Sequence, residues 1–348
     1  MSPQPSFASF ESSGGARVHR IPVEAFPGFW AYTYLIHHDA NHYLIDCGSG
    51  TEPSHKDLLA GLEKVGIQPS DLTRILLTHA HVDHYAGLSK LKPLTDAKIG
   101  CHELDVQTVA HHEARLAFTS RRLASFLAET GLAKEEAASL LNIYRFTKSI
   151  YKSVPVDFTF GAMGMRVGPF ETIHLPGHCA GHVAIRLDDI IFCGDMVVEG
   201  VTPHLFPESI SPYNGLDHYL ESLNRFQHWA KDTRLILNGH DDVITDVTAK
   251  VEATHRNLIR RMSKAIRALG EPLTIAEICV AVYGEMGGYQ QLLVIEKTGA
   301  YIEYFYEHGL IEIMNAGEVE QGIPARYRRL REIANDEILP KVEYSVVE

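Results

Sequence analysis

The chain has 348 residues, of which 45% are hydrophobic and 22% are charged, a composition typical of a folded globular protein and not of a disordered one. Its length exceeds that of most single domains, so we expect a main domain and a smaller one. The formal net charge of −12 opposes attraction to nucleic acids and to anionic membranes.

The N-terminus and the cysteines indicate the compartment. The first residues, MSPQPSFASFESSGG, include neither the basic nor the apolar segment of a signal peptide. No apolar run approaches the length of a membrane span. The five cysteines are odd in number and form no CxxC pair, which favours reduced, buried thiols. We therefore expect a flexible tail at residues 1–16, a cytoplasmic location and no membrane partner.

Short apolar runs separated by turn residues begin at residue 17. The runs AYTYLIHH and HYLIDCG are typical of paired strands, and HKDLLAGLEKVG has the spacing of a helix before the short strand TRILL. Further strands are predicted at VDFTF, MRVGPFETIHL, HVAIRL, IIFCGD and LILNG, with a helix at LDHYLESLNRFQHWAK before the last. This alternation predicts a layered α/β domain over residues 17–248.

Two segments have mainly helical patterns. Residues 103–152 carry helical spacing with few turn residues and predict a helical insertion, on which we expect His111 and His112 to be solvated. Residues 249–348 predict three helices and a pair of short strands, the pattern of a winged-helix domain. Its third helix is acidic, because Lys297 is the only Lys or Arg in residues 289–308. We therefore expect no nucleic-acid partner.

The stretch LTHAHVDH concentrates metal-ligand side chains directly after the strand TRILL. Imidazole nitrogens and carboxylate oxygens suit zinc and iron. In an extended loop, alternation would direct His79 and His81 to one ion and Asp83 with His84 to a second. Three further ligand-type residues follow predicted strands, namely His178 in LPGHCAGH, Asp195 in FCGD and His240 in LNGH. Active sites of layered α/β proteins commonly form at such strand ends.

The motifs THAHVDH, PGHCAGH, CGD and NGH, in this order, resemble the metal-binding motifs of the metallo-β-lactamase superfamily. The resemblance spans roughly residues 17–247 and implies an αββα sandwich, two mixed sheets packed face to face with helices outside. It also implies a ligand set in which one ion is bound by His79, His81 and His178, a second by Asp83, His84 and His240, and both by a bridging Asp195. The segments GVTPHLFPE, LDHYLESLNRF, THRNLIRRM and PLTIAEICVAVYGE resemble the subgroup with a C-terminal β-lactamase-associated winged helix, which includes ribonucleases, thioesterases and glyoxalase-II-like hydrolases.

This ligand set implies hydrolysis. A water between two divalent ions loses a proton far more readily than bulk water, so a metal-bridging hydroxide is available near neutral pH. We expect two Zn²⁺ ions, with Fe or Mn as alternatives, and attack on the carbonyl of a thioester, ester or lactone. Asp83, between His81 and His84, is the expected catalytic residue that orients the hydroxide. His204 lies on a Pro-flanked loop after Asp195 and is the expected substrate contact.

Other readings of the same motifs remain. An endoribonuclease or phosphodiesterase would use the same two-metal site, although the acidic net charge and the acidic third helix count against it. A single-iron oxygenase of the persulfide dioxygenase type resembles the first motif, but the presence of both Asp83 and His240 favours two ions. The expected partner is a small-molecule substrate, an acyl thioester or a lactone, and we expect a homodimer because the insertion and the third helix are rich in apolar and aromatic residues.

Overall fold

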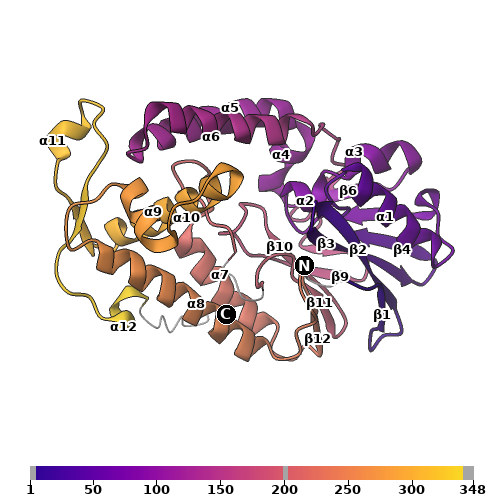
Figure 1. The fold of residues 1–348 in the computed structure, drawn as a ribbon. Helices are drawn as coiled ribbons and strands as arrows, with labels where there is room; N and C mark the ends of the chain where they lie inside the picture. Colours follow the sequence, from indigo (N-terminus) through magenta and orange to yellow (C-terminus); the bar gives the residue numbers. More distant parts are fainter. Residues whose placement is uncertain (1–4, 199–202, 340–348) are drawn as a thin grey trace.

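Two mixed β-sheets pack face to face in this computed structural model, which describes residues 5–198 and 203–339 (Figure 1). The first sheet follows chain order, with antiparallel pairing through its first four strands and parallel pairing after them: β1 (Ala8–Glu11), β2 (Arg17–Phe26), β3 (Phe29–His38), β4 (Asn41–Ile45), β5 (Arg74–Leu76), β6 (Lys98–Cys101) and β7 (Phe158–Thr159). The second sheet has the order β12 (Leu235–Leu237), β11 (Ile190–Phe192), β10 (Val183–Leu187), β9 (Phe170–His174) and β8 (Arg166–Val167), with one parallel pair, β11 and β12.

The space between the sheets is filled by apolar side chains that alternate along the strands. Val18, Tyr34 and Ile36 of the first sheet pack with Ile185 and Phe192 of the second, and all five are buried. Burial of such side chains contributes roughly 1.5–3 kcal/mol each, so the sandwich is held mainly by this layer. The two-sheet α/β architecture predicted from the sequence is confirmed.

Helices cover the outer faces of both sheets. On the first sheet lie α1 (Glu52–Glu63), α2 (Val82–Tyr85) and α3 (Leu88–Leu91), which share a core with β2 to β6. The short η1 (Pro69–Asp71) and η2 (Lys92–Leu94) bury no side chain. Thr51 caps α1, because its side chain accepts a hydrogen bond from the Ser54 amide. On the second sheet, α7 (Leu216–Trp229) buries Tyr219, Leu223 and Phe226.

Two details of the strands differ from the sequence predictions. The expected flexible tail contains a strand, because Ala8–Glu11 pairs with β2 and Phe10 packs against the core between the sheets. Residues 1–4 of that tail lie outside the described residues. The single strand predicted at MRVGPFETIHL is a hairpin, since Gly168 has a φ of 58° and turns the chain between β8 and β9.

The predicted helical insertion lies between β6 and β7 and consists of η3 (Glu103–Asp105), α4 (Val106–Ala110), α5 (His112–Glu129) and α6 (Lys134–Ser149). In Figure 1, α5 and α6 lie side by side and extend from the sandwich over α9 and α10. Leu123, Phe126 and Leu140 join this pair to the core around the second sheet. The insertion therefore links the sandwich to the C-terminal helices.

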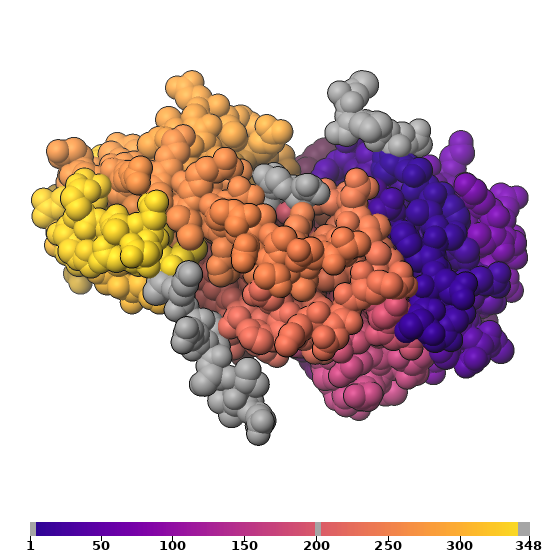
Figure 2. Space-filling view, turned by 90° about the horizontal axis from the view of Figure 1, so that it is seen from below, coloured from indigo at the N-terminus to yellow at the C-terminus, as the bar shows by residue number. Residues whose placement is uncertain are grey.

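The C-terminal part begins with α8 (Val247–Ala268), α9 (Ile275–Tyr283) and α10 (Gly288–Glu307) and ends with β13 (Ile311–Ile313), α11 (Ala316–Val319), β14 (Tyr327–Arg329) and α12 (Asn335–Ile338). Figure 2 shows the segment around α8, in orange, across the middle of the surface between the yellow C-terminal part and the indigo N-terminal strands. Leu258 of α8 and Tyr301 and Phe305 of α10 belong to the same apolar cluster as α7. Among the described residues, no helix combines the length and apolar character required to cross a membrane.

Candidate metal centre

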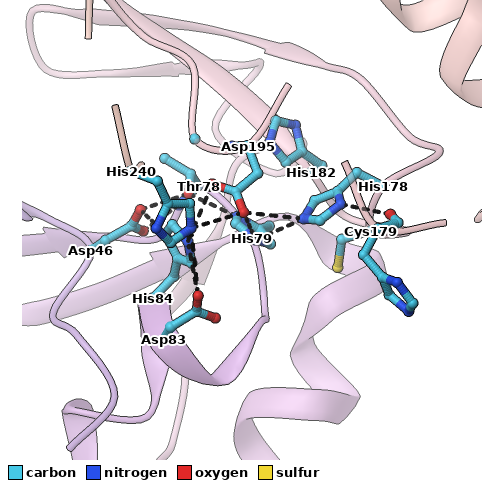
Figure 3. A network of polar contacts seen from close by, with 12 residues as sticks. Asp46, Thr78, His79, Asp83, His84, His178, Cys179, His182, Asp195 and His240 are labelled. Carbon is cyan, nitrogen blue, oxygen red and sulfur yellow. Dashed lines mark hydrogen bonds and ion pairs between the residues drawn. The ribbon is translucent and has the colours of Figure 1, made fainter. Parts of the chain in front are cut away.

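Four strands end at one edge of the sandwich, and a ligand-type side chain follows each of them. β5 leads to His79, β9 to His178, β11 to Asp195 and β12 to His240. Figure 3 shows Asp195 in the middle of the resulting polar network, with His178 on one side of it, His84 and His240 on the other, and His79 below it. The structure thus brings together all seven residues singled out in the sequence, in two groups.

The first group contains His79, His81, His178 and Asp195, whose ligand atoms all lie within 4.8 Å of one another. The Nε2 atoms of His79 and His178 are 3.3 Å apart. Asp195 Oδ2 lies 3.5 Å from His178 Nε2 and 3.9 Å from His79 Nε2. Three imidazoles and one carboxylate oxygen therefore face one small volume.

The second group contains Asp83, His84 and His240, within the same 4.8 Å limit. His240 Nε2 lies 3.4 Å from His84 Nε2 and 3.5 Å from Asp83 Oδ2. Asp195 also reaches this group, since its Oδ2 is 3.2 Å from His240 Nε2 and its Oδ1 is 3.4 Å from His84 Nε2. The carboxylate of Asp195 is thus shared by both groups.

The HAHVDH stretch changes conformation halfway along. His81 is still extended, with φ −85° and ψ 147°, and it is the residue before the helical turn of α2. The expectation that extended alternation runs through the whole motif is therefore wrong for Asp83 and His84. They lie on a helical turn, where consecutive side chains diverge by about 100°, and both still reach the second group.

The Nδ1 atoms of four histidines point away from the centre to protein partners. His178 Nδ1 donates to the His204 carbonyl at 2.9 Å and His240 Nδ1 to the Trp30 carbonyl at 2.8 Å. Nδ1 of His84 lies 2.8 Å from Asp46 Oδ2, and Nδ1 of His79 lies 3.0 Å from Thr78 Oγ1. A hydrogen on Nδ1 leaves the Nε2 lone pair free, so these contacts orient the rings as metal ligands.

Asp46 and Asp105 support the centre and were not singled out in the sequence. Asp46 follows β4, accepts hydrogen bonds from the Thr78 amide and hydroxyl at 2.8 and 2.7 Å, and also contacts His84. Its position at the end of the predicted strand HYLIDCG could have identified it as a residue of the site, because the other ligand-type residues also follow predicted strands. Asp105, in η3, accepts from the Ala80 amide at 2.9 Å and the Gly181 amide at 3.0 Å. Asp105 therefore joins two ligand loops that lie about a hundred residues apart in the sequence. No local sequence pattern predicts this role.

The electrostatics of the centre favour a bound cation. Burial lowers the pKa of His79 and His81 well below the usual range, and neighbouring imidazoles lower it further. Burial also lowers the pKa of His240, but Asp195 and Asp83 outweigh it and raise that pKa to about 9. Burial raises the pKa of Asp195, but His240 and His84 outweigh this effect and hold it well below its usual range. A persistent carboxylate between neutral and cationic imidazoles is a ligand arrangement that binds a proton or a metal ion.

Three further observations show that these residues fit metal ions. Two ligand atoms at about 2.05 Å from a tetrahedral ion lie about 3.4 Å apart, close to the 3.3 and 3.4 Å between the imidazole pairs. Asp195 Oδ1 is buried and has no hydrogen-bond partner among the described residues. Gly239 is required next to the centre, because a Cβ there would lie 2.4 Å from that oxygen.

Residues around the centre have mostly structural contacts. His182 is buried, and its Nε2 accepts a hydrogen bond from the Asp195 amide at 3.2 Å, so it supports the backbone beside Asp195 and belongs to neither ligand group. His112 was expected in solvent, but it is 5% exposed, because its ring lies between the Tyr85 hydroxyl and the Lys148 carbonyl. His204 lies at the centre through its carbonyl, while its ring contacts Glu296 at 3.0 Å. All five cysteines are free and buried, as predicted.

The chain belongs to the metallo-β-lactamase superfamily: residues 30–240 match the sequence family described as "Metallo-beta-lactamase superfamily". The probable metallo-hydrolase YqjP of Bacillus subtilis (strain 168) is 26% identical over 288 residues, which are 78% of this chain and 86% of the relative. A hydroxyacylglutathione hydrolase of Shewanella loihica is 25% identical over 222 residues, which are 63% of this chain and 64% of the relative.

Solved structures share the fold. A metallo-β-lactamase family protein from Thermus thermophilus has a TM-score of 0.69 and 23% identity, over 90% of this chain and 98% of the other. A β-lactamase domain protein from Burkholderia ambifaria has a TM-score of 0.71 and 19% identity, over 92% and 94% of the two chains. At these identities, the likeness concerns the fold. With the family membership and the ligand groups, the chain is a hydrolase of this superfamily with a His and Asp metal site.

Proposed function

We propose that the protein is a binuclear metallohydrolase that cleaves the carbonyl bond of a thioester, ester or lactone. The observation that carries this proposal is the position of Asp195, whose two carboxylate oxygens approach imidazoles of both ligand groups at 3.2 to 3.5 Å. A carboxylate shared in this way suits two adjacent divalent ions. His79, His81 and His178 would hold one ion, and Asp83, His84 and His240 the other.

Bound divalent ions would supply an acidified water and a positive charge that polarises the substrate carbonyl oxygen. The chain's own residues would prepare the site in two ways. Asp83 lies within 3.5 Å of His240 Nε2, and in this proposal its carboxylate would accept a hydrogen bond from the attacking oxygen and hold it in line. Asp46, Trp30 and His204 hold the rings of His84, His240 and His178 through their Nδ1 atoms. This fixed ring orientation reduces the reorganisation needed during the reaction.

A thioester is the substrate class that the relatives support. Several curated relatives are named hydroxyacylglutathione hydrolases, at 24 to 26% identity. The basis for the assignment to this chain is the shared family together with the ligand groups. We keep lactones and esters in the proposal, because the attack on their carbonyl needs the same groups.

The test is turnover of a panel by metal-loaded protein. The panel contains an acyl thioester, a lactone, an aryl ester and single-stranded RNA, and Asp83→Ala is measured beside the unaltered chain. Asn41→Ala, on β4 and away from the ligands, is the control for handling and folding. We expect thioester cleavage that is lost in Asp83→Ala and kept in the control. Unchanged turnover in Asp83→Ala would refute the assigned role.

Other outcomes would redirect the proposal. RNA cleavage without thioester cleavage would identify the endoribonuclease that uses the same two-metal site. Metal analysis that finds one iron per chain, with oxygen consumption on a persulfide, would identify the dioxygenase. Analysis of the purified protein is expected to give two divalent ions per chain, Zn²⁺ first and Fe or Mn second.

The C-terminal part and the oligomeric state belong to the same proposal. We propose that α8, α9, α10, β13 and β14 form a winged-helix module over residues 249–348 that serves the substrate site and no nucleic acid. A homodimer is supported by exposed apolar side chains on the insertion, Phe118, Phe146 and Ile150. Light scattering that gives a monomer at micromolar concentration would rule the dimer out.

A further inference from the structure

The metal centre is more open at some of its ligand-type residues than at others. His81, Asp83 and His240 are half-buried, whereas the other four are buried. A phenylalanine ring lies next to two of these three residues. The ring centroids of Phe29 and His240 are 4.8 Å apart, and those of Phe206 and His81 are 6.4 Å apart. Each ligand group therefore has an aromatic ring beside a half-buried member.

The backbone around Phe29 fixes its ring beside His240. Phe29 is the first residue of β3, and Gly28, with a φ of 75°, turns the chain just before it. The Gly28 amide donates a hydrogen bond to the Glu24 carboxylate at 2.9 Å. On the other side, the Trp30 carbonyl accepts a hydrogen bond from His240 Nδ1 at 2.8 Å. The hairpin that carries Phe29 is thus hydrogen-bonded directly to a ligand-type residue.

The Phe29 ring has apolar surface that the fold does not use. It is 45% exposed, although it packs against His240. Phe26, across the hairpin, packs against the core of the first sheet, whereas Phe29 belongs to none of the apolar clusters of the described residues. Removal of apolar surface from water is favourable. An exposed phenyl ring beside the metal centre is therefore available to cover an apolar part of a bound ligand.

We propose that Phe29 is a specificity-determining residue whose ring contacts an apolar group of the substrate, an aryl or alkyl chain, beside the second ligand group. Aromatic side chains that line binding sites supply apolar contact area and pack well against flat groups. Phe206 gives the first ligand group a similar but half-buried surface. This inference rests on the proposed carbonyl hydrolysis and adds to it the apolar character of a group near the scissile bond.

Two pairs of thioesters test the proposal on the metal-loaded full chain. In the first pair, propanoate and 3-phenylpropanoate are joined to the same thiol, N-acetylcysteamine, so that the acyl side differs by a phenyl group in place of a hydrogen. In the second pair, acetate is joined to ethanethiol or to 2-phenylethanethiol, so that the same difference lies on the thiol side. The ratio of kcat/KM within each pair measures the preference for an apolar group.

Phe29→Ala removes the ring, and Phe29→Leu keeps an apolar side chain. Tyr306→Ala is the matched control, because Tyr306 is aromatic and 52% exposed in the last turn of α10. We expect the unaltered chain to prefer the phenyl member of at least one pair. Phe29→Ala should lower kcat/KM for that member about 5- to 30-fold, since an aromatic contact is lost, and less than about 2-fold for the small member. Phe29→Leu should lie between the two, and Tyr306→Ala should keep the preference.

Binding without turnover gives a second readout. The metal-loaded chain is titrated in a calorimeter with the products of the preferred pair, either the two acids or the two thiols. The phenyl product should bind more tightly, and Phe29→Ala should bring the two dissociation constants within about 2-fold of each other. Metal content is measured in each variant, because the neighbouring Trp30 carbonyl holds His240. If Phe29→Ala loses metal, Phe29→Leu replaces it, and an unchanged preference in that variant counts against the proposal.

Three results overturn the proposal: an unaltered chain without preference in either pair, a preference that Phe29→Ala keeps, and a loss in Phe29→Ala that is equal for both members of a pair. The binding titrations separate this inference from the proposed hydrolysis. If no thioester is cleaved, the hydrolysis proposal fails, and all four products are titrated. Tighter binding of a phenyl product that Phe29→Ala abolishes then still supports the contact, and equal binding refutes it.

Discussion

The metal centre and the helical insertion are built in different ways. The ligands of the metal centre follow the ends of strands in the sandwich, and four of them occupy six consecutive positions from His79 to His84. The insertion instead packs α6 against α10, about 140 residues later in the chain. The sandwich therefore positions the proposed chemistry, and the added helices reach the centre through indirect contacts such as that of Glu296 on α10 with His204. Changes in the two regions should have separable effects.

The largest effect is expected from Asp195→Ala, which removes the carboxylate shared by both ligand groups. Loss of several kcal/mol of charge stabilisation in the transition state lowers the rate by more than about 100-fold. Metal content measured by emission spectrometry should fall below two ions per chain. Full metal content with unchanged turnover would show that Asp195 is not shared between ions.

The next largest effect is expected from Asp105→Ala, which removes the hydrogen bonds that join the loops of His79 and His178. Two backbone amides, those of Ala80 and Gly181, lose a carboxylate partner in a fully buried position. We expect about 10- to 100-fold weaker metal binding, the range found for residues that orient ligands. Titration with Zn²⁺ against a chelator measures it. Asp105→Asn, which keeps one acceptor oxygen, should lie between the two, and equal affinities in all three chains would contradict the prediction.

The sequence was sufficient for the parts of the molecule that depend on local patterns. Strands such as RILL and the helix of α10 follow from apolar periodicity, and the seven ligand-type residues follow from motifs at strand ends. The sequence was not sufficient for contacts between distant segments. Asp105 with Gly181, His112 with Lys148, and His204 with Glu296 each need two segments whose packing no periodicity encodes. The correct position of His112 in the interior depends on such a contact.

Glu296→Ala tests whether the C-terminal part supports the metal centre. The Glu296 carboxyl contacts His204 at 3.0 Å, and the His204 carbonyl in turn holds His178 Nδ1. Loss of this buried partner should lower the free energy of unfolding by about 1–3 kcal/mol, and should weaken metal binding less than about 10-fold. Urea unfolding and the same Zn²⁺ titration measure both. Glu307→Ala, exposed on the same helix, is the control and should change neither quantity.

A smaller effect concerns pH. Burial raises the pKa of Glu296 from 4.5 to about 8 in the folded chain. Between these values the folded state keeps a proton that the unfolded state has lost, so this residue makes the fold less stable as the pH rises from about 4.5 to 8. In Glu296→Gln this contribution disappears, and the Tm should fall less over that range than in the unaltered chain. Parallel Tm curves from calorimetry in the two chains would show that the carboxyl does not titrate there.

The smallest effect is expected on α8, where a groove of about 530 Å³ is lined by cationic side chains, Arg256, Arg260, Lys264 and Arg267. This helix lies on the far side of α10 from α6 (Figure 1). Arg260 is exposed, so Arg260→Ala should change the free energy of unfolding by less than about 0.5 kcal/mol, as a surface substitution does. Thioester kcat/KM should change less than about 2-fold, because none of the residues that line the groove belongs to either ligand group. If RNA is cleaved and both Arg260→Ala and Asp83→Ala abolish cleavage, the groove and the metal centre act on one long anionic chain, and the separation between the sandwich and the C-terminal helices does not hold.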